Sequence, residues 1–159
     1  MPARMVCWLI AVVVGLGLVG RAEGATWNLI TPGETHYGEV STRLGIPTIK
    51  VTENRNVRGA LPVVHAVWEG SSAPKGTERV EVFFGAKDLL PRLIIVKPVN
   101  MARSEVHEEY GPPGQSGTTE DNVLVDRYPV LGLAATYQAD GQTVSRLEFF
   151  EGVRGRYGR

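Results

Sequence analysis

The sequence predicts an α+β protein built from two tandem repeats, each a short helix followed by about three antiparallel strands. Three observations support this fold class: an internal repeat, a glycine-and-proline ending after both predicted helices, and short runs of β-branched and aromatic residues after each ending. We expect the two helices to pack on one face of a continuous antiparallel sheet.

The repeat is visible as a fixed spacing between identical residues. With a shift of 66 positions, one set of residues falls on its counterparts: Pro32, Glu39, Val40, Gly45, Pro47, Thr52, Asn56 and Val57 fall on Pro98, Glu105, Val106, Gly111, Pro113, Thr118, Asn122 and Val123. A shift of 67 fits the later part better, because it places residues 79–83 on 146–150 and keeps the side-chain alternation in phase. We therefore place repeat 1 at residues 29–87 and repeat 2 at residues 95–152.

Each repeat begins with a predicted helix, over residues 34–44 and 100–110. The apolar spacing is that of a narrow helical stripe, formed by Tyr37, Val40 and Leu44 in the first copy and by Ala102, Val106 and Tyr110 in the second. Gly45 and Gly111 end the helices, since each is followed within two residues by a proline that cannot continue one.

Three strands are predicted after each helix, and their β-branched and aromatic content supports them. The predicted strands are 48–53, 63–69 and 78–84 in the first copy, and 122–126, 130–138 and 143–150 in the second. The segments 70–76 and 139–142 have the composition of hairpin turns, which favours antiparallel neighbours.

The N-terminus has the architecture of a signal peptide. Arg4 precedes an apolar run over residues 6–19, and small residues follow it. This run is shorter than the roughly 20 apolar residues that a bilayer core needs, so cleavage is favoured over a permanent anchor. Residues 1–22 form the predicted signal peptide, with cuts as late as Ala25 also compatible, and the alternative is an uncleaved membrane anchor. The sequence thus indicates a periplasmic or secreted protein with no stable span after cleavage.

The only cysteine, Cys7, lies in the predicted leader. The mature chain is therefore expected to contain no disulfide, no catalytic thiolate and no cysteine-ligated metal. The whole chain has 17 basic and 17 acidic residues, without the basic stripe that nucleic-acid binding requires. Residues 153–159 carry three spaced arginines among glycines and are expected to be a flexible tail.

One motif occurs in both copies: Glu-Val-x-x-x-Leu-Gly-x-Pro from Glu39 to Pro47, and Glu-Val-x-x-x-Tyr-Gly-x-Pro from Glu105 to Pro113. It resembles the SmpA/BamE-like and β-lactamase-inhibitor-like superfamily, in which a short helix and this exit precede an antiparallel sheet. A tandem pair resembles the secreted β-lactamase inhibitors, whereas single-copy members resemble envelope lipoproteins of the outer-membrane assembly machinery. The chain lacks the lipidated cysteine of those lipoproteins, and its first hairpin lacks the Asp-Tyr pair that inhibitors insert into their target.

Residues with catalytic potential are few and do not form a known motif. The sequence has no nucleophile elbow and no phosphate-binding loop. The histidines favour structural roles, and the run from His107 to Glu109 is expected to be a solvated helix face. We therefore predict no catalytic residue, no cofactor and no metal site. The alternative hypothesis is a small periplasmic hydrolase or ligand-binding protein using His36, Glu105 and His107.

The repeated positions are those needed to build a module twice rather than to run chemistry twice. The sequence thus favours an exported, non-enzymatic protein-binding module of the cell envelope, either an assembly factor or an enzyme inhibitor, whose partner is another envelope or secreted protein. Trp68, Tyr128, Tyr137 and Arg146 are the candidate partner-binding residues, because Trp, Tyr and Arg dominate interface hot spots. The alternative for these residues is packing between sheet and helix.

Overall fold

The computed structural model describes residues 24–53 and 63–152. Within them, the apolar and β-branched runs of the chain form two helices and eight strands. In chain order, with a single 3₁₀ turn (Gly70–Ser72) after β2, the elements are α1 (Tyr37–Leu44), β1 (Ile49–Glu53), β2 (Val63–Glu69), β3 (Thr77–Gly85), β4 (Pro91–Pro98), α2 (Arg103–Tyr110), β5 (Gln115–Thr118), β6 (Leu124–Tyr128), β7 (Leu133–Tyr137) and β8 (Val144–Phe150).

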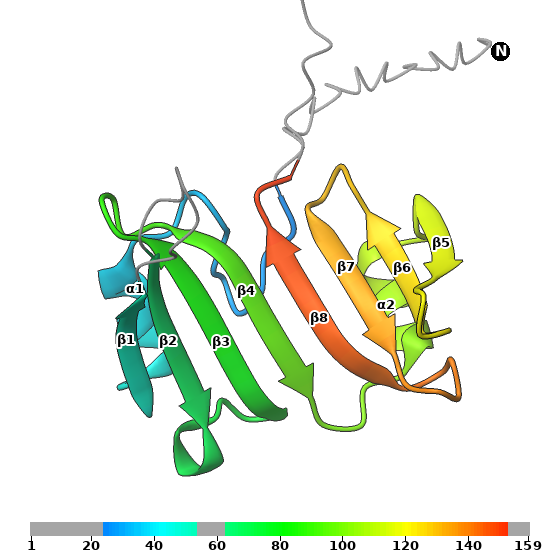
Figure 1. The fold of residues 1–159 in the computed structure, drawn as a ribbon, viewed down its shortest axis with the longest axis horizontal. Helices are drawn as coiled ribbons and strands as arrows, with labels where there is room; N and C mark the ends of the chain where they lie inside the picture. The colour runs from blue at the N-terminus through cyan, green and yellow to red at the C-terminus, as the bar shows by residue number, and fades with distance from the viewer. Residues whose placement is uncertain (1–23, 54–62, 153–159) are drawn as a thin grey trace, which may run out of the picture.

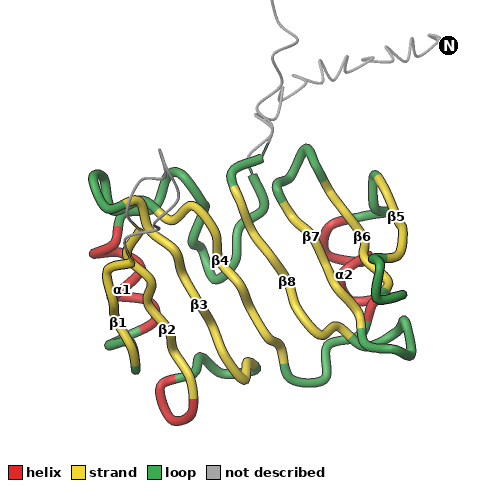
Figure 2. Tube along the Cα trace, viewed as in Figure 1, coloured by secondary structure: helices red, strands yellow, loops and turns green. Residues whose placement is uncertain are grey.

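The strands make one antiparallel sheet in the order β1-β2-β3-β4-β8-β7-β6-β5. We call α1 with β1 to β4 the first half, and α2 with β5 to β8 the second half. The last strands of the two halves pair at the centre of the sheet, from Leu93 opposite Phe150 to Val96 opposite Leu147. Figures 1 and 2 show both helices behind the sheet, one towards each end.

The predicted fold class is wrong in its repeat unit. The structure is mostly a single eight-stranded antiparallel sheet with two short helices, not two repeats of a helix and three strands. The sequence prediction missed β4 and β5. Strand β4 begins at Pro91 and ends at Pro98, and prolines are tolerated at the ends of a strand. Strand β5 is short, polar and glycine-containing, as edge strands often are.

The predicted helix ends are confirmed, since Gly45 and Gly111 take positive φ values of 78° and 79° after the last helical residues. The predicted starts are wrong by three residues at Tyr37 and Arg103. The shift of 66 superimposes α1 on α2 and the start of β1 on that of β5. The shift of 67 is wrong, because it aligns β3 with β8, and these strands occupy different positions in the sheet order.

The sheet has a helix face and an open face. The helix face carries the core, whose largest fully buried side chains include Trp68, Phe84, Ile94, Leu133 and Phe149. The Trp68 indole donates a hydrogen bond to the Gly45 carbonyl at 3.1 Å, which ties the end of α1 to β2. The open face carries the alternate side chains of each strand, because strand residues point to opposite faces with a period of two.

The predicted signal peptide and flexible tail lie outside the described residues. Within residues 24–53 and 63–152, neither helix has the length and apolar character needed to cross a membrane.

Candidate functional site

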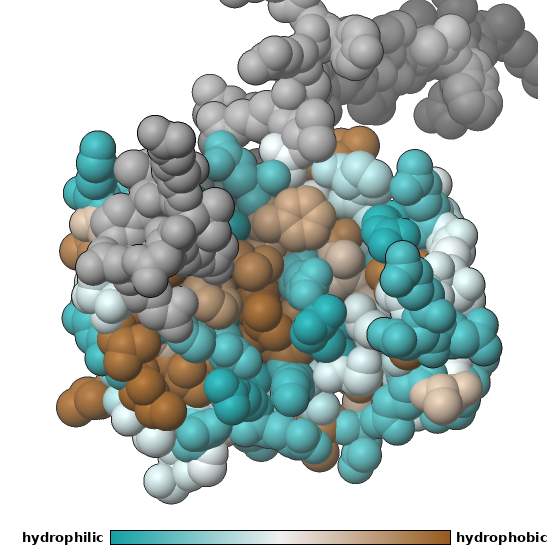
Figure 3. All heavy atoms as spheres, viewed as in Figure 1, coloured by the Kyte–Doolittle hydropathy of each residue, from teal (hydrophilic) through white to brown (hydrophobic). Residues whose placement is uncertain are grey.

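The side chains of the open face follow a regular pattern at its centre, where β3, β4 and β8 are neighbouring strands. Strands β3 and β8 both present the pattern Arg-x-Glu-x-Phe to this face, as Arg79, Glu81 and Phe83 and as Arg146, Glu148 and Phe150. Strand β4 lies between them. Figure 3 shows this face, with hydrophobic side chains over its centre and over β1, and with polar side chains around them.

A row of mostly apolar side chains, here called the apolar row, crosses five strands of the open face; its one polar member is His65, whose Nε2 lies 2.9 Å from Glu81 Oε2. Its members oppose one another in register: Val51, His65, Phe83, Leu93 and Phe150. Val51 is 44% exposed and the other four are partly exposed. The rings of His65 and Phe83 stack with centroids 4.2 Å apart. The apolar row is therefore a continuous surface band, not a set of scattered side chains.

Charged side chains border the apolar row on one side. Glu81, Ile95 and Glu148 oppose one another in the next row, and Arg79 opposes Lys97 in the row beyond. Each arginine pairs along its own strand: Arg79 Nε lies 3.0 Å from Glu81 Oε1, and Arg146 Nη2 lies 3.0 Å from Glu148 Oε1. The open face thus has an apolar centre with a charged border, which is the usual anatomy of a protein interface.

A hollow of about 290 Å³ continues this surface over β6, β7 and β8. Val125, Arg127, Thr136, Arg146 and Glu148 are among the residues that line it. It lies beside the charged border, so one surface combines a flat apolar band and a polar recess.

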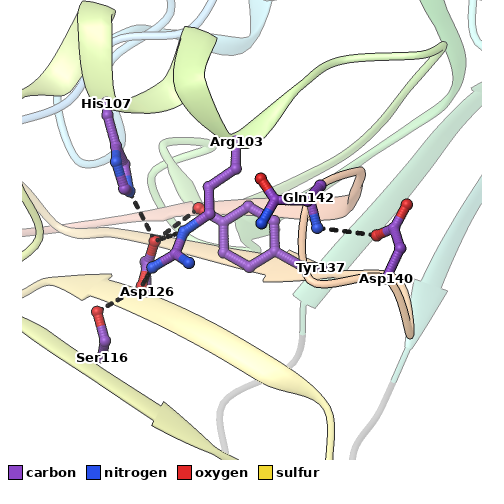
Figure 4. A network of polar contacts seen from close by, with 7 residues as sticks. All are labelled: Arg103, His107, Ser116, Asp126, Tyr137, Asp140 and Gln142. Carbon is purple, nitrogen blue, oxygen red and sulfur yellow. Dashed lines mark hydrogen bonds and ion pairs between the residues drawn. The ribbon is translucent and has the colours of Figure 1, made fainter.

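The helix face of the second half contains a buried polar cluster around Asp126, which is 0% exposed (Figure 4). Its carboxylate accepts two hydrogen bonds from Arg103, at 2.9 and 3.0 Å, and one each from His107 at 2.8 Å, Ser116 at 2.6 Å and Tyr137 at 2.8 Å. These donors come from α2, β5 and β7, so the carboxylate joins the helix to three strands.

The donors determine the charge state of this carboxylate. Burial raises the pKa of Asp126, but the hydrogen bonds from Ser116, His107, Arg103 and Tyr137 outweigh burial and lower it to about 2. Burial and the neighbouring Asp126 raise the pKa of Tyr137, which stays a neutral donor. The carboxylate is saturated with donors, which indicates a structural role and not that of a general base.

The residues of the hydrolase hypothesis do not assemble into one site. His107 contacts Asp126, whereas the Glu105 carboxylate accepts a hydrogen bond from the Ala102 backbone at the start of α2. His36 precedes α1, at the other end of the sheet (Figure 1). The Ser116 hydroxyl, which belongs to the same cluster as His107, donates to Asp126 and not to the histidine. This cluster therefore does not pair a nucleophile with a base.

Three of the four predicted contact residues lie in the core. Trp68, Tyr128 and Tyr137 are 0%, 4% and 1% exposed on the helix face, so they are not available to a partner in the folded protein. The hypothesis that they bind a partner is corrected in favour of packing. Arg146 alone lies on the open face, with a side chain 46% exposed.

A signal for the open face was present in the sequence. Phe83 lies two and four residues after a glutamate and an arginine, and so does Phe150. Each phenylalanine therefore points to the same face of the sheet as these charged residues. The sequence prediction used this pattern to align the repeats and named Arg146 as a contact residue, but it did not name Phe83 or Phe150.

No cluster of metal-ligating side chains is present among the described residues. Comparisons of the chain with protein-family models, with curated proteins and with solved structures find no match.

Proposed function

We propose that this chain is an exported, non-enzymatic binding module that holds another envelope or secreted protein on the open face of its sheet. The observation that carries the proposal is the apolar row, with its aromatic side chains bordered by charge. Burying partly exposed Phe83, Leu93 and Phe150 against a partner contributes roughly 25 cal/mol per Å² of apolar surface.

The chemistry of the border narrows the kind of partner. Arginines and glutamates alternate along β3 and β8 and already pair with each other, so the surface has no strong charge of one sign. A partner that fits presents an apolar ridge to the apolar row and hydrogen-bonding groups to its border. The resemblance of the helix-exit motif to envelope assembly factors and secreted inhibitors supports the same class of function.

The test is site-specific photo-crosslinking in the host cell. A photoreactive residue is placed at Leu93 or Phe150 on the open face, and at Glu108 on α2 as a matched position on the opposite face. We expect one specific protein adduct from the two open-face positions and none from position 108. Absence of an adduct from the open face, or the same adduct from all three positions, contradicts the proposal.

A second step measures affinity once the adduct is identified. Leu93→Asp introduces a charge into the apolar row and is expected to weaken binding at least about tenfold. Val130→Asp is the control, because Val130 is also exposed, at 62%, but lies in the turn before β7. Equal affinity of the two variants would remove the apolar row from the interface.

A further inference from the structure

A cavity of about 630 Å³ lies on the helix face, between the two helices and away from the open face. Its volume falls within the range typical of small-molecule sites. Its floor is formed by Val96 and Leu147, which oppose each other where β4 pairs with β8. The cavity therefore lies over the junction of the two halves, and both halves contribute to its walls.

Part of the wall of this cavity is aromatic and apolar, and the rest is polar or charged. Trp27 and Tyr110 line it together with Met101, and all three are partly buried against the core. Trp27 belongs to a tight turn closed by its bridge to Ile30. These side chains offer flat apolar surfaces to a bound molecule.

The turn that carries Trp27 is strained. Asn28 and Leu29 have φ values of 48° and 61°, and Leu29 is 70% exposed. A left-handed backbone is costly for leucine, and glycine is the usual residue at this second turn position. Exposure of Leu29 means that burial of its side chain does not offset the strain. Such strain is typical of segments shaped for a binding site.

The charges at the cavity have opposite signs on its two sides. Arg43 lies in the last turn of α1, and Glu109 occupies the equivalent position in α2, 66 residues later. Lys75, in the turn before β3, adds a second cation. Among the described residues, neither Arg43 nor Lys75 is in an ion pair, so both are available to an incoming carboxylate.

We propose that this cavity binds a short zwitterionic peptide with apolar side chains. The peptide carboxylate faces Arg43 and Lys75, and its ammonium group faces Glu109. An apolar side chain lies between Trp27 and Tyr110, above Val96 and Leu147. The charge pattern favours this ligand over a fatty acid, which has no group for Glu109, and over an apolar molecule, which leaves both charges unused. This site is separate from the open face, and the proposal does not depend on protein binding there.

The test is calorimetric titration of the full chain with the tripeptide Leu-Phe-Leu in three forms: free, N-acetylated and C-amidated. We expect the free peptide to bind, and each cap to weaken binding about threefold to fivefold by removing one charge. Trp27→Ala is expected to weaken the free peptide about tenfold.

Matched variants assign each charge. Arg43→Gln is expected to weaken the free peptide but to leave the C-amidated form unchanged, and Glu109→Gln is expected to do the same with the N-acetylated form. Glu108→Gln is the control, because it removes the same charge from the neighbouring position of α2. No binding of the free peptide at millimolar concentration, equal affinity of the three forms, or equal effects of Glu108→Gln and Glu109→Gln would each overturn the proposal. These outcomes are independent of crosslinking from the open face.

Discussion

The two halves of the molecule attach a helix to the sheet by different chemistry at equivalent positions. The helices coincide after a shift of 66, and Lys50 opposes Ala66 as Ser116 opposes Asp126. The pairing of β2 with β3 and of β6 with β7 extends the equivalence from these residues to positions in β3 and β7. The equivalent pairs are Tyr37 and Arg103, Ser41 and His107, Lys50 and Ser116, Ala66 and Asp126, and Phe84 and Tyr137. All five members from the second half belong to the polar cluster.

The first half fills these positions with the rings of Tyr37 and Phe84, the small side chains of Ser41 and Ala66, and the exposed Lys50. The Tyr37 ring meets Phe84 edge to face at 5.1 Å, and Lys50 lies over Tyr37 at 4.1 Å. In the second half, Arg103 lies over the Tyr137 ring at 5.2 Å while its guanidinium holds Asp126. The same backbone thus supports attachment by apolar burial or by directed hydrogen bonds.

The difference shows what a buried carboxylate requires. Asp126 occupies the position equivalent to Ala66. Burying its carboxylate removes a charge from water, which is costly unless hydrogen-bond donors surround it. The second half supplies five such hydrogen bonds to Asp126, and they offset the cost of burying its charge. The polar cluster therefore has a buried charge to satisfy, whereas none of the equivalent positions of the first half holds a buried charge.

The largest expected effect on stability comes from a change in the apolar core of the first half. Trp68→Ala removes a side chain that is 0% exposed and that donates to the Gly45 carbonyl. We expect the free energy of unfolding to fall by about 3 to 5 kcal/mol, measured by urea denaturation at neutral pH. Leu29→Ala, in an exposed turn, is the control and is expected to change stability by less than about 0.5 kcal/mol. A loss below about 1.5 kcal/mol for Trp68→Ala would show that α1 is held by other contacts.

The second effect belongs to the polar side and depends on pH. The pKa of Asp126 is lower in the folded than in the unfolded chain, so its stabilisation is present above the unfolded pKa and is lost as pH falls towards 2. A shift from 3.8 to about 2 corresponds to roughly 2 kcal/mol. Urea denaturation from pH 6 to pH 2 measures the loss. Asp126→Asn is expected to remove this part of the acid dependence, and an unchanged profile in that variant would contradict the assignment.

The smallest effect compares two buried tyrosine hydroxyls. The Tyr137 hydroxyl donates to Asp126, whereas the Tyr128 hydroxyl is buried with no hydrogen-bond partner among the described residues. Tyr137→Phe is expected to cost about 1 kcal/mol, and Tyr128→Phe to be neutral or to stabilise by up to about 1 kcal/mol. Thermal unfolding of the two variants side by side checks the sign, and an equal loss in both would refute the distinction.

Sequence patterns predicted the helices well because their signals are local. A glycine followed by proline ends a helix wherever the chain goes next, and Gly45 and Gly111 do so. The missed strands depend on distant partners instead. Strand β4 is apolar on both faces and bounded by prolines, and only its neighbours β3 and β8 fix it at the centre of the sheet. Strand β5 has four polar or glycine residues, and its pairing with β6 defines it.

The candidate site was harder to predict, because the sequence does not show which face of the sheet the helices cover. Strand β2 alternates Val64, Ala66 and Trp68 with Val63, His65 and Val67, and both sets are apolar enough for a core. Residue type alone favoured Trp68, which the helix face buries. The Asp126 cluster was missed for a related reason: its donors come from three elements whose proximity appears only after folding.

The pairing of β4 with β8 has a consequence for how the chain assembles. The two strands meet antiparallel, as would two identical subunits related by a twofold axis. Each half on its own would expose β4 or β8 as an edge strand, whose unpaired backbone groups can pair with another chain. The short connection between Pro98 and Arg103 keeps the second half at a high effective concentration beside the first. Pairing of the two halves is thus a step within one chain and needs no encounter between two molecules.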